Sequence, residues 1–299
     1  MENDPLHAAV RRLLRDVSVE VTPRETGTLD EVAAVLPPGT SVYVTDLGLG
    51  LDASLDAARR IRVHGLRPVV HLAVRSIPDL AALDRTFGLL ADAGVDDLLL
   101  VAGSRAAAGS IENTLPVLES DALARRGFAS IGVAGHPEGN PGVDEGAVDD
   151  ALARKDKIAS ELGLPLHVVT QFAFSADPVL GWERRVRAAG IRLPVRVGLP
   201  GLTSPARLLR FGLKCGVGPS LAVLRKQTGS VLKLATQTYR PADTLAGLAR
   251  AATADPESLI SAVHFFPFGA VVPTAHWATA LRDGRFAIRD DGALLTDED

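Results

Sequence analysis

The sequence predicts an α/β protein folded as a (β/α)8 TIM barrel, and three observations lead to this prediction. Eight short apolar segments have the composition of buried parallel strands, and amphipathic stretches typical of helices alternate with them. Several of those stretches end on a glycine just before the next apolar segment, as helices commonly do. The 299 residues also suit one closed barrel, so we expect a single domain over residues 1–299.

The expected elements follow one another along the whole chain. The strands are VSVEV (17–21), SVYVT (41–45), PVVHLAV (68–74), DDLLLVAG (96–103), SIGVAG (130–135), PLHVVTQF (165–172), PVRVGL (194–199) and SAVHFF (261–266). Helices are expected at 5–15, 51–65, 78–94 and 176–190. Residues 200–260 are more than one helix needs, which predicts extra helices between the seventh and eighth strands. The acidic tail from about residue 290 to 299 is expected to be disordered.

The alternative architecture is an open, doubly wound parallel sheet. That fold commonly binds dinucleotides through a G-x-G-x-x-G turn after a strand, and no expected strand is followed by this motif. The stretch VTDLGLGLD (44–52) contains a GLG, but its spacing differs from the fingerprint. The closed barrel is therefore favoured.

Composition limits the classes of function. No run approaches the roughly 18 apolar residues of a membrane span, and the first residues lack the apolar core of a signal peptide, so a soluble, cytoplasmic protein is expected. The net charge is −4 and the basic residues are scattered, which argues against nucleic acid as a partner. The single cysteine excludes an intramolecular disulfide. His71, His136, Glu138 and His264 lack metal-motif spacing, so no metal is expected. A homo-oligomer is compatible with the sequence.

Candidate functional residues recur at the carboxyl ends of the expected strands, where TIM barrels carry their active sites. They are Glu20, Thr45, His71, Gly103, Ser104, His136, Glu138, Asn140 and Gln171. A carboxylate inside a barrel mouth is costly to bury, so Glu20 needs an ionic partner, a helix to cap or a chemical task. A lone histidine in an apolar run, such as His71, is more often a hydrogen-bonded core residue than a ligand. Gln171 could equally satisfy neighbouring backbone groups. The stiff loop GVAGHPEGNP (132–141) is expected to be shaped around a ligand.

Several segments together resemble the methylenetetrahydrofolate reductase family, whose catalytic domain is a TIM barrel. AGHPEGNP is similar to the family's A-x-Y-P-E-x-H-P loop, and VVTQFAF to its I-T-Q-x-x-F strand end. SVEVTP resembles its S-F-E-F-x-P start, SVYVT its S-V-T-Y strand and VVHLAV its P-H-L-T strand. The resemblance runs from about residue 17 to 270. It implies an oxidoreductase of one-carbon metabolism, as in methionine biosynthesis, with a reduced folate as substrate, FAD as cofactor and NAD(P)H as hydride donor.

The resemblance also implies roles for individual residues. Glu20 matches the general acid, which assists opening of the bridging methylene to an iminium ion by protonating a folate nitrogen. Gln171 matches the glutamine that hydrogen-bonds the pterin, and Phe172 begins the aromatic segment beside it. The implied flavin contacts are Thr45, His71, Gly103, His136, Glu138 and Asn140, with Lys157 and Lys155 near the flavin phosphates.

The end of the fourth strand departs from the family. Ala102 and Ser104 of VAGS stand where the family's L-R-G-D has its arginine and its aspartate. The resemblance therefore implies that Ser104 occupies a position close to both folate and flavin. This departure leaves three hypotheses open. The first is a flavin-dependent enzyme interconverting 5,10-methylenetetrahydrofolate and 5-methyltetrahydrofolate. The second is a flavin-free folate-binding protein or a tetrahydrofolate-dependent methyl-transfer or demethylation partner. The third is an unrelated TIM-barrel enzyme.

Overall fold

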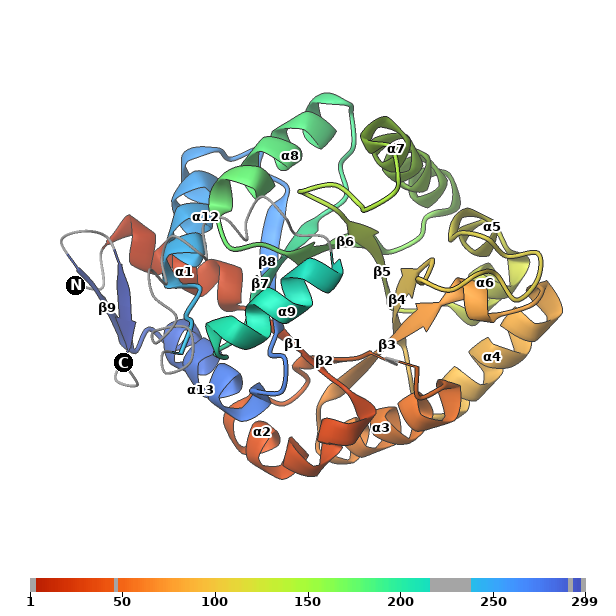
Figure 1. Cartoon of the computed structure of the whole chain (residues 1–299), viewed down its shortest axis with the longest axis horizontal. Coiled ribbons are helices and arrows are strands. Elements are labelled where there is room, and N and C mark those ends of the chain that lie inside the picture. Colours follow the sequence, from red (N-terminus) through yellow and green to blue (C-terminus); the bar gives the residue numbers. More distant parts are fainter. Residues whose placement is uncertain (1–3, 46–47, 216–237, 290–292, 297–299) are drawn as a thin grey trace.

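Eight parallel strands form a closed barrel at the centre of the molecule (Figure 1). The computed structural model describes residues 4–45, 48–215, 238–289 and 293–296. The barrel strands are β1 (Ser18–Val21), β2 (Ser41–Val44), β3 (Arg67–Ala73), β4 (Asp97–Val101), β5 (Ser130–Gly135), β6 (Leu166–Phe172), β7 (Val195–Pro200) and β8 (Ile260–Phe266). All eight coincide with the expected strands to within a few residues, and the (β/α)8 fold class is confirmed.

The register closes the barrel by pairing its first strand with its last. β1 pairs with β2 from Ser18↔Ser41 to Val21↔Val44, and it pairs with β8 through Ser18↔His264 and Val19↔Phe265. Most strand residues are buried, because the strands face helices outside and one another's side chains inside. All strands run in the same direction, so their carboxyl ends meet at one mouth.

A ring of helices covers the outside of the barrel (Figure 1). It comprises α2 (Leu29–Val35), α3 (Leu51–Val63), α4 (Leu80–Asp92), α5 (Leu115–Leu118), α6 (Asp121–Arg126), α7 (Glu145–Leu162), α8 (Ala176–Ala188) and α13 (Val271–Arg282). The side chain of Asp79 caps α4 by accepting from the amide of Ala82, and Gly163 ends α7 in the left-handed conformation. Among the described residues, no helix is long and apolar enough to cross a bilayer.

The expected extra helices are present between β7 and β8. α9 (Pro205–Cys215) lies over the mouth of the barrel, whereas α12 (Ala242–Ala254) packs outside it against α1 (Pro5–Leu14). Arg12 of α1 donates to the carbonyl oxygen of Ala252 at 2.8 Å. The N-terminal helix thus lies where the sequence predicts it, and α9 is the inserted element that can act on the site.

The carboxyl-terminal segment differs from the expected disordered tail in part. β9 (Phe286–Ile288) and β10 (Leu294–Thr296) form an antiparallel hairpin with Leu294 opposite Ile288. Leu294 is buried against the main core, and this apolar contact explains why the segment is ordered despite the acidic residues around it. The remaining residues of the expected tail, 290–292 and 297–299, lie outside the described part of the chain.

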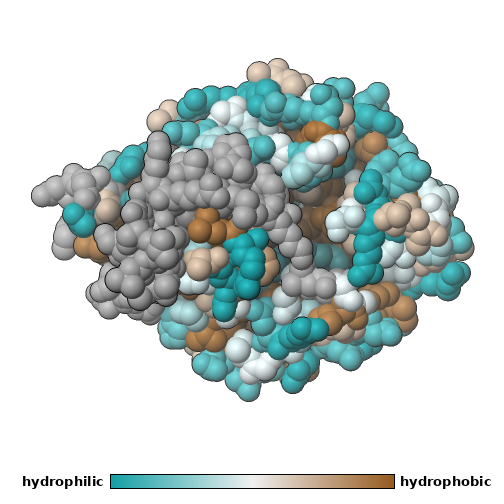
Figure 2. Space-filling view, viewed as in Figure 1, coloured by the Kyte–Doolittle hydropathy of each residue, from teal (hydrophilic) through white to brown (hydrophobic). Residues whose placement is uncertain are grey.

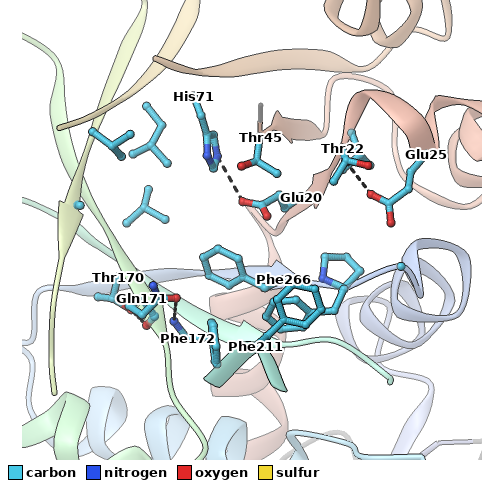
Figure 3. A pocket seen from close by; sticks show the side chains of 18 of the residues that line it. Glu20, Thr22, Glu25, Thr45, His71, Thr170, Gln171, Phe172, Phe211 and Phe266 are labelled. Atoms are coloured by element: carbon cyan, nitrogen blue, oxygen red, sulfur yellow. Dashed lines mark hydrogen bonds and ion pairs between the residues drawn. The ribbon is translucent and has the colours of Figure 1, made fainter. Parts of the chain in front are cut away.

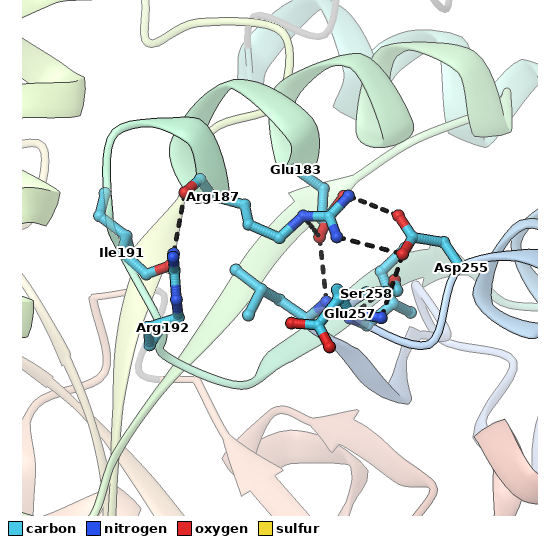
Figure 4. A network of polar contacts seen from close by, with 9 residues as sticks. Glu183, Arg187, Ile191, Arg192, Asp255, Glu257 and Ser258 are labelled. Carbon is cyan, nitrogen blue, oxygen red and sulfur yellow. Dashed lines mark hydrogen bonds and ion pairs between the residues drawn. The ribbon is translucent and has the colours of Figure 1, made fainter.

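An ionic network ties α8 to the beginning of β8 on the outer wall (Figure 4). Glu183 is buried and accepts from the backbone amide of Leu259 at 3.0 Å. Arg187, one turn later, lies 3.3 Å from the same carboxylate and also donates to Asp255 at 3.2 Å. The network joins the barrel to its helical layer far from the mouth, so we assign it a structural role.

Candidate active site at the barrel mouth

A cavity of about 500 Å³ opens at the carboxyl ends of the strands, beneath α9. Its walls come from β1, β3, β4, β5, β6 and β8, and Glu20, His71, His136 and Gln171 are among its lining residues. Figure 2 shows apolar residues inside the central hollow and mostly hydrophilic residues around it. The volume is in the range typical of small-molecule sites. The structure therefore brings six of the sequence-predicted residues together at one cavity, since Thr45 and Phe172 line it as well.

Glu20 places a carboxyl group in an apolar part of this cavity. It is the third residue of β1, and its side chain is 17% exposed. Burial, and then the nearby negative charge of Glu25, raises the pKa of Glu20 to about 8. The carboxylate of Glu25 accepts from the amide of Thr22 at 2.7 Å, which holds that charge in the turn after β1. Glu20 is consequently protonated at neutral pH and can donate a proton.

His71 is the polar neighbour of Glu20 (Figure 3). Its Nε2 lies 3.4 Å from Oε2 of Glu20, and burial lowers the pKa of His71 to about 3. Both groups are thus neutral at pH 7, and the contact is between a carboxylic acid and an imidazole rather than an ion pair. The distance is long for a hydrogen bond, so the acidic proton remains available to a ligand in the cavity.

Gln171 faces the cavity from the opposite wall, at the end of β6 (Figure 3). Its Oε1 accepts from the backbone amide of Phe172 at 3.0 Å. Because a backbone amide can only donate, this bond fixes which end of the side-chain amide is oxygen. The –NH₂ group is then directed away from the backbone and can donate to a ligand.

An aromatic cluster forms the floor next to Gln171. Phe172 is buried and its ring lies 5.0 Å from that of Phe268, in an edge-to-face arrangement. Phe266 lies 5.7 Å from Phe172 and lines the cavity too. Flat, apolar walls of this kind favour a flat ring system as ligand.

α9 contributes a cationic rim that the sequence analysis did not identify. Arg207, Arg210 and Phe211 line the cavity, and Phe211 stacks on Phe268 with ring centroids 4.8 Å apart. Arg207 donates to the carbonyl oxygen of Phe268 at 2.7 Å. The R-x-x-R-F spacing in an amphipathic segment was the available signal, but nothing in the sequence indicated that this segment crosses the mouth.

A second pocket, of about 630 Å³, adjoins the cavity. Thr45 and His71 line both, while Gly103 and Ser104 line the second alone. Gly103 has φ +91°, and a Cβ there would meet the Cβ of Ala73 at 3.2 Å, so glycine is required at this turn. Arg24, Arg75 and Arg105 also line this pocket and were not anticipated from the sequence.

The loop after β5 and the following helix bring only some of the residues predicted there to the cavities. His136 lines the cavity, and burial, with Lys155 as the second cause, lowers its pKa to about 4. Burial also lowers the pKa of Lys155 to about 8. Glu138 and Asn140 line neither pocket, and the side chain of Lys157 is 74% exposed, 3.7 Å from Glu161. Lys155, rather than Lys157, is therefore the lysine whose charge acts on the site.

These features define the chain as a (β/α)8 barrel protein with two adjoining pockets at its mouth, one apolar and acid-bearing, the other basic. Among the described residues, no three His, Cys, Asp or Glu side chains are arranged to hold a metal ion. No protein-family model matches the chain. Among solved structures, dihydropteroate synthase from Thermus thermophilus is similar, with 18% sequence identity over 89% of this chain and 90% of that one and a TM-score of 0.44.

Proposed function

We propose that the protein is an oxidoreductase that interconverts 5,10-methylenetetrahydrofolate and 5-methyltetrahydrofolate, with FAD as cofactor and NAD(P)H as hydride donor. The observation that carries the proposal is the position of the Glu20 carboxyl in an apolar cavity, across from the amide of Gln171, where burial raises its pKa to about 8. The resemblance of the strand ends to methylenetetrahydrofolate reductases supplies the identity of the ring that these groups would bind.

The protonation state of Glu20 suits the first step of this reaction. In the reducing direction, Glu20 donates its proton to a folate nitrogen, and the bond between that nitrogen and the bridging methylene carbon breaks with its electron pair going to the nitrogen. The carbon becomes an iminium electrophile, which accepts a hydride to give the methyl group. A carboxyl with an ordinary pKa would be ionised at neutral pH and could not act in this way. Because burial raises the pKa of Glu20 to about 8, this carboxyl group keeps the proton that it donates at neutral pH.

The rest of the cavity matches the other parts of a folate. The –NH₂ group of Gln171 can donate to an acceptor on the pterin edge, and the rings of Phe211 and Phe266 offer faces for the benzoyl group. Arg207 and Arg210 supply positive charge at the rim, where the glutamate carboxylates would lie. The cavity thus offers an acid, an amide, aromatic walls and a cationic rim, one complementary group for each part of the ligand.

The residues of the second pocket fit a dinucleotide such as FAD. Thr45, His71 and Gly103, the three positions similar to flavin contacts of the reductase family, lie together in its wall. The basic lining suits a diphosphate. When bound, FAD would carry the hydride between NAD(P)H and the folate.

A flavin-free protein is the second candidate, and one specific observation favours it. Ser104 lines the second pocket where the reductase family has an aspartate, and Ala102 replaces the adjacent arginine. In this variant of the proposal, the folate cavity is unchanged, and NAD(P)H transfers its hydride directly or a methyl-transfer partner takes the folate. Visible absorption of the purified protein, before and after incubation with FAD and desalting, separates the two candidates.

The proposed reaction is tested by NAD(P)H-dependent reduction of methylenetetrahydrofolate by the wild type, Glu20→Gln and Glu161→Gln. The last variant removes a carboxylate that is 60% exposed on α7 and serves as the matched control. We expect Glu20→Gln to lower turnover by about 10²–10⁴, as loss of a general acid does. Tetrahydrofolate binding should persist, and reduction of any bound flavin by NAD(P)H should be spared. Unaltered folate turnover in Glu20→Gln would exclude the acid role.

A further inference from the structure

The described lining of the second pocket concentrates positive charge. Arg24, Arg75 and Arg105 all line it, and the part of its lining that the structure describes contains no carboxylate. Three guanidinium groups around one cavity repel one another, and each lacks a nearby anion in that lining. Such an arrangement is favourable when a multiply charged anion occupies the pocket.

One of these arginines is held by hydrogen bonds, and a second lies over a glycine. Arg75 follows β3, donating through Nε to the carbonyl of Glu112 at 2.7 Å and through Nη1 to the carbonyl of Gly103 at 3.2 Å. Arg105 lies over Gly48, where a Cβ would be 2.9 Å from Nη2. The glycine therefore leaves the space that this side chain occupies. A guanidinium group that is oriented before binding, as that of Arg75 is, loses less entropy when it takes up an anion.

Arg24 comes from another element, the 3₁₀ turn Pro23–Thr28 that follows β1. The turn is fixed at its start, where the amide of Thr22 donates to Glu25 at 2.7 Å. Glu25 lines the folate cavity rather than the basic pocket. The same turn thus places a carboxylate at one pocket and a cation at the other.

We propose that Arg24, Arg75 and Arg105 bind the diphosphate of the dinucleotide that serves the hydride transfer. This inference rests on the proposed function, to which it adds the residues that hold the donor. The pocket meets the folate cavity at Thr45 and His71, so a dinucleotide with its diphosphate on the arginines can direct its redox ring to that border. FAD and NAD(P)H share the diphosphate, and the experiment must distinguish them.

The test compares the full-length wild type with the double variant Arg24→Gln, Arg105→Gln. Arg75 is kept because it also supports the β4 loop through two backbone carbonyls. The matched control is Arg85→Gln, Arg154→Gln, which removes two exposed arginines on α4 and α7 and gives the same change in net charge. Dissociation constants for FAD, NADH, NADPH and ADP-ribose are measured by calorimetry, with tetrahydrofolate as the ligand of the other cavity.

We expect the pocket variant to bind the wild type's preferred dinucleotide at least about tenfold more weakly, because two charge-assisted contacts are lost. ADP-ribose, which carries the diphosphate without the redox ring, should weaken in parallel, while tetrahydrofolate binding changes by less than about twofold. The control should match the wild type throughout. Preference for FAD or for NAD(P)H in the wild type identifies which dinucleotide uses the pocket.

The outcomes that overturn the inference differ from those that overturn the proposed function. If the wild type reduces methylenetetrahydrofolate but the pocket variant binds the dinucleotide normally, the function stands and the arginine site is wrong. The site is equally wrong if the variant loses tetrahydrofolate instead. If dinucleotide binding depends on the arginines but no folate is turned over, the proposed function fails and the site remains. A wild type that binds none of the four nucleotides refutes both.

Discussion

Replacement of Glu20 by glutamine should change how the stability of the protein depends on pH. The substitution keeps the shape of the side chain and removes its ionisation. In the folded state, burial raises the pKa of Glu20 from 4.5 to about 8, so the folded protein retains a proton that the unfolded chain releases. Stability from this group is therefore present below the unfolded pKa of 4.5, declines as pH rises towards about 8 and changes no further above that.

The structure sets the size of the effect. Each unit of pKa difference corresponds to about 1.4 kcal/mol. Because the pKa of Glu20 rises from 4.5 to about 8 on folding, ionisation of Glu20 alone would lower the free energy of unfolding of the wild type by about 3 kcal/mol between about pH 5 and about pH 7.5. The side chain is 17% exposed to the cavity, and water there reduces the cost of ionisation. We therefore expect about 1–3 kcal/mol.

The assay is urea denaturation of the wild type and Glu20→Gln at several values between about pH 5 and about pH 8. Buried neutral histidines such as His71 act in the opposite direction, because folding stability falls as pH drops below their unfolded pKa of 6.5. Their contribution is common to both proteins and cancels in the difference. The control Glu161→Gln should follow the wild type, since this carboxylate is 60% exposed.

The expected result is a stability difference that grows with pH in favour of Glu20→Gln. A difference that stays constant to within about 0.5 kcal/mol would mean that Glu20 titrates alike in the folded and unfolded states, and the acid role would lose its physical basis. The same pKa predicts that folate turnover by the wild type falls above about pH 8, where the acid form is lost.

Further predictions concern the cavity wall, the charge behind it and the barrel. Gln171→Ala should weaken tetrahydrofolate binding about tenfold while leaving flavin content unchanged, and an unaltered dissociation constant would remove this residue from the pocket. Lys155→Met should raise the pKa of His136, followed by NMR titration, because Lys155 contributes to its lowering; Lys157→Met should not. Gly198→Ala should cost at least about 2 kcal/mol in thermal or urea unfolding, since its Cβ would lie 2.4 Å from a carbonyl oxygen of β6, and a wild-type midpoint would contradict that close packing.

Much of the barrel was predictable because its strands differ from the helices in composition. Buried parallel strands are apolar on both faces, so segments such as DDLLLVAG and PVRVGL contrast sharply with the amphipathic helices between them. Glu20 and Gln171 were predictable for the same reason, since a polar side chain at the end of such a strand is conspicuous. The sequence shows that Glu20 and Gln171 lie near the carboxyl ends of their strands. Because the strands of a closed barrel are all parallel, both residues then lie at the same mouth.

The choice between neighbouring lysines could not be made from the sequence. Lys155 and Lys157 are two residues apart on α7, and at about 100° per residue their side chains leave the helix in nearly opposite directions. Only the packing of α7 against the barrel decides that Lys155 is the half-buried one. Glu138 and Asn140 illustrate the same limit, because a loop rich in proline and glycine can direct its side chains towards the site or away from it.

The basic groups of the site were not predictable because they come from elements with no fixed relation to the strand ends. Arg207 and Arg210 reach the cavity through α9, an insertion that crosses the mouth, and Arg24 and Arg105 lie in connecting segments. In the sequence nothing distinguishes them from ordinary surface arginines. Their proposed function depends on their positions in the folded structure.

The proposed chemistry requires that the arginines of the two pockets lie away from the carboxyl of Glu20. A cation beside Glu20 would favour the carboxylate and lower its pKa, whereas burial and the negative Glu25 raise the pKa to about 8. His71 contacts Glu20 without lowering the pKa of that carboxyl, because burial keeps the imidazole neutral. The site thus needs arginines for anionic ligands and an uncharged border for the acid. Two pockets that share Thr45 and His71, with their arginines elsewhere in the walls, satisfy both requirements.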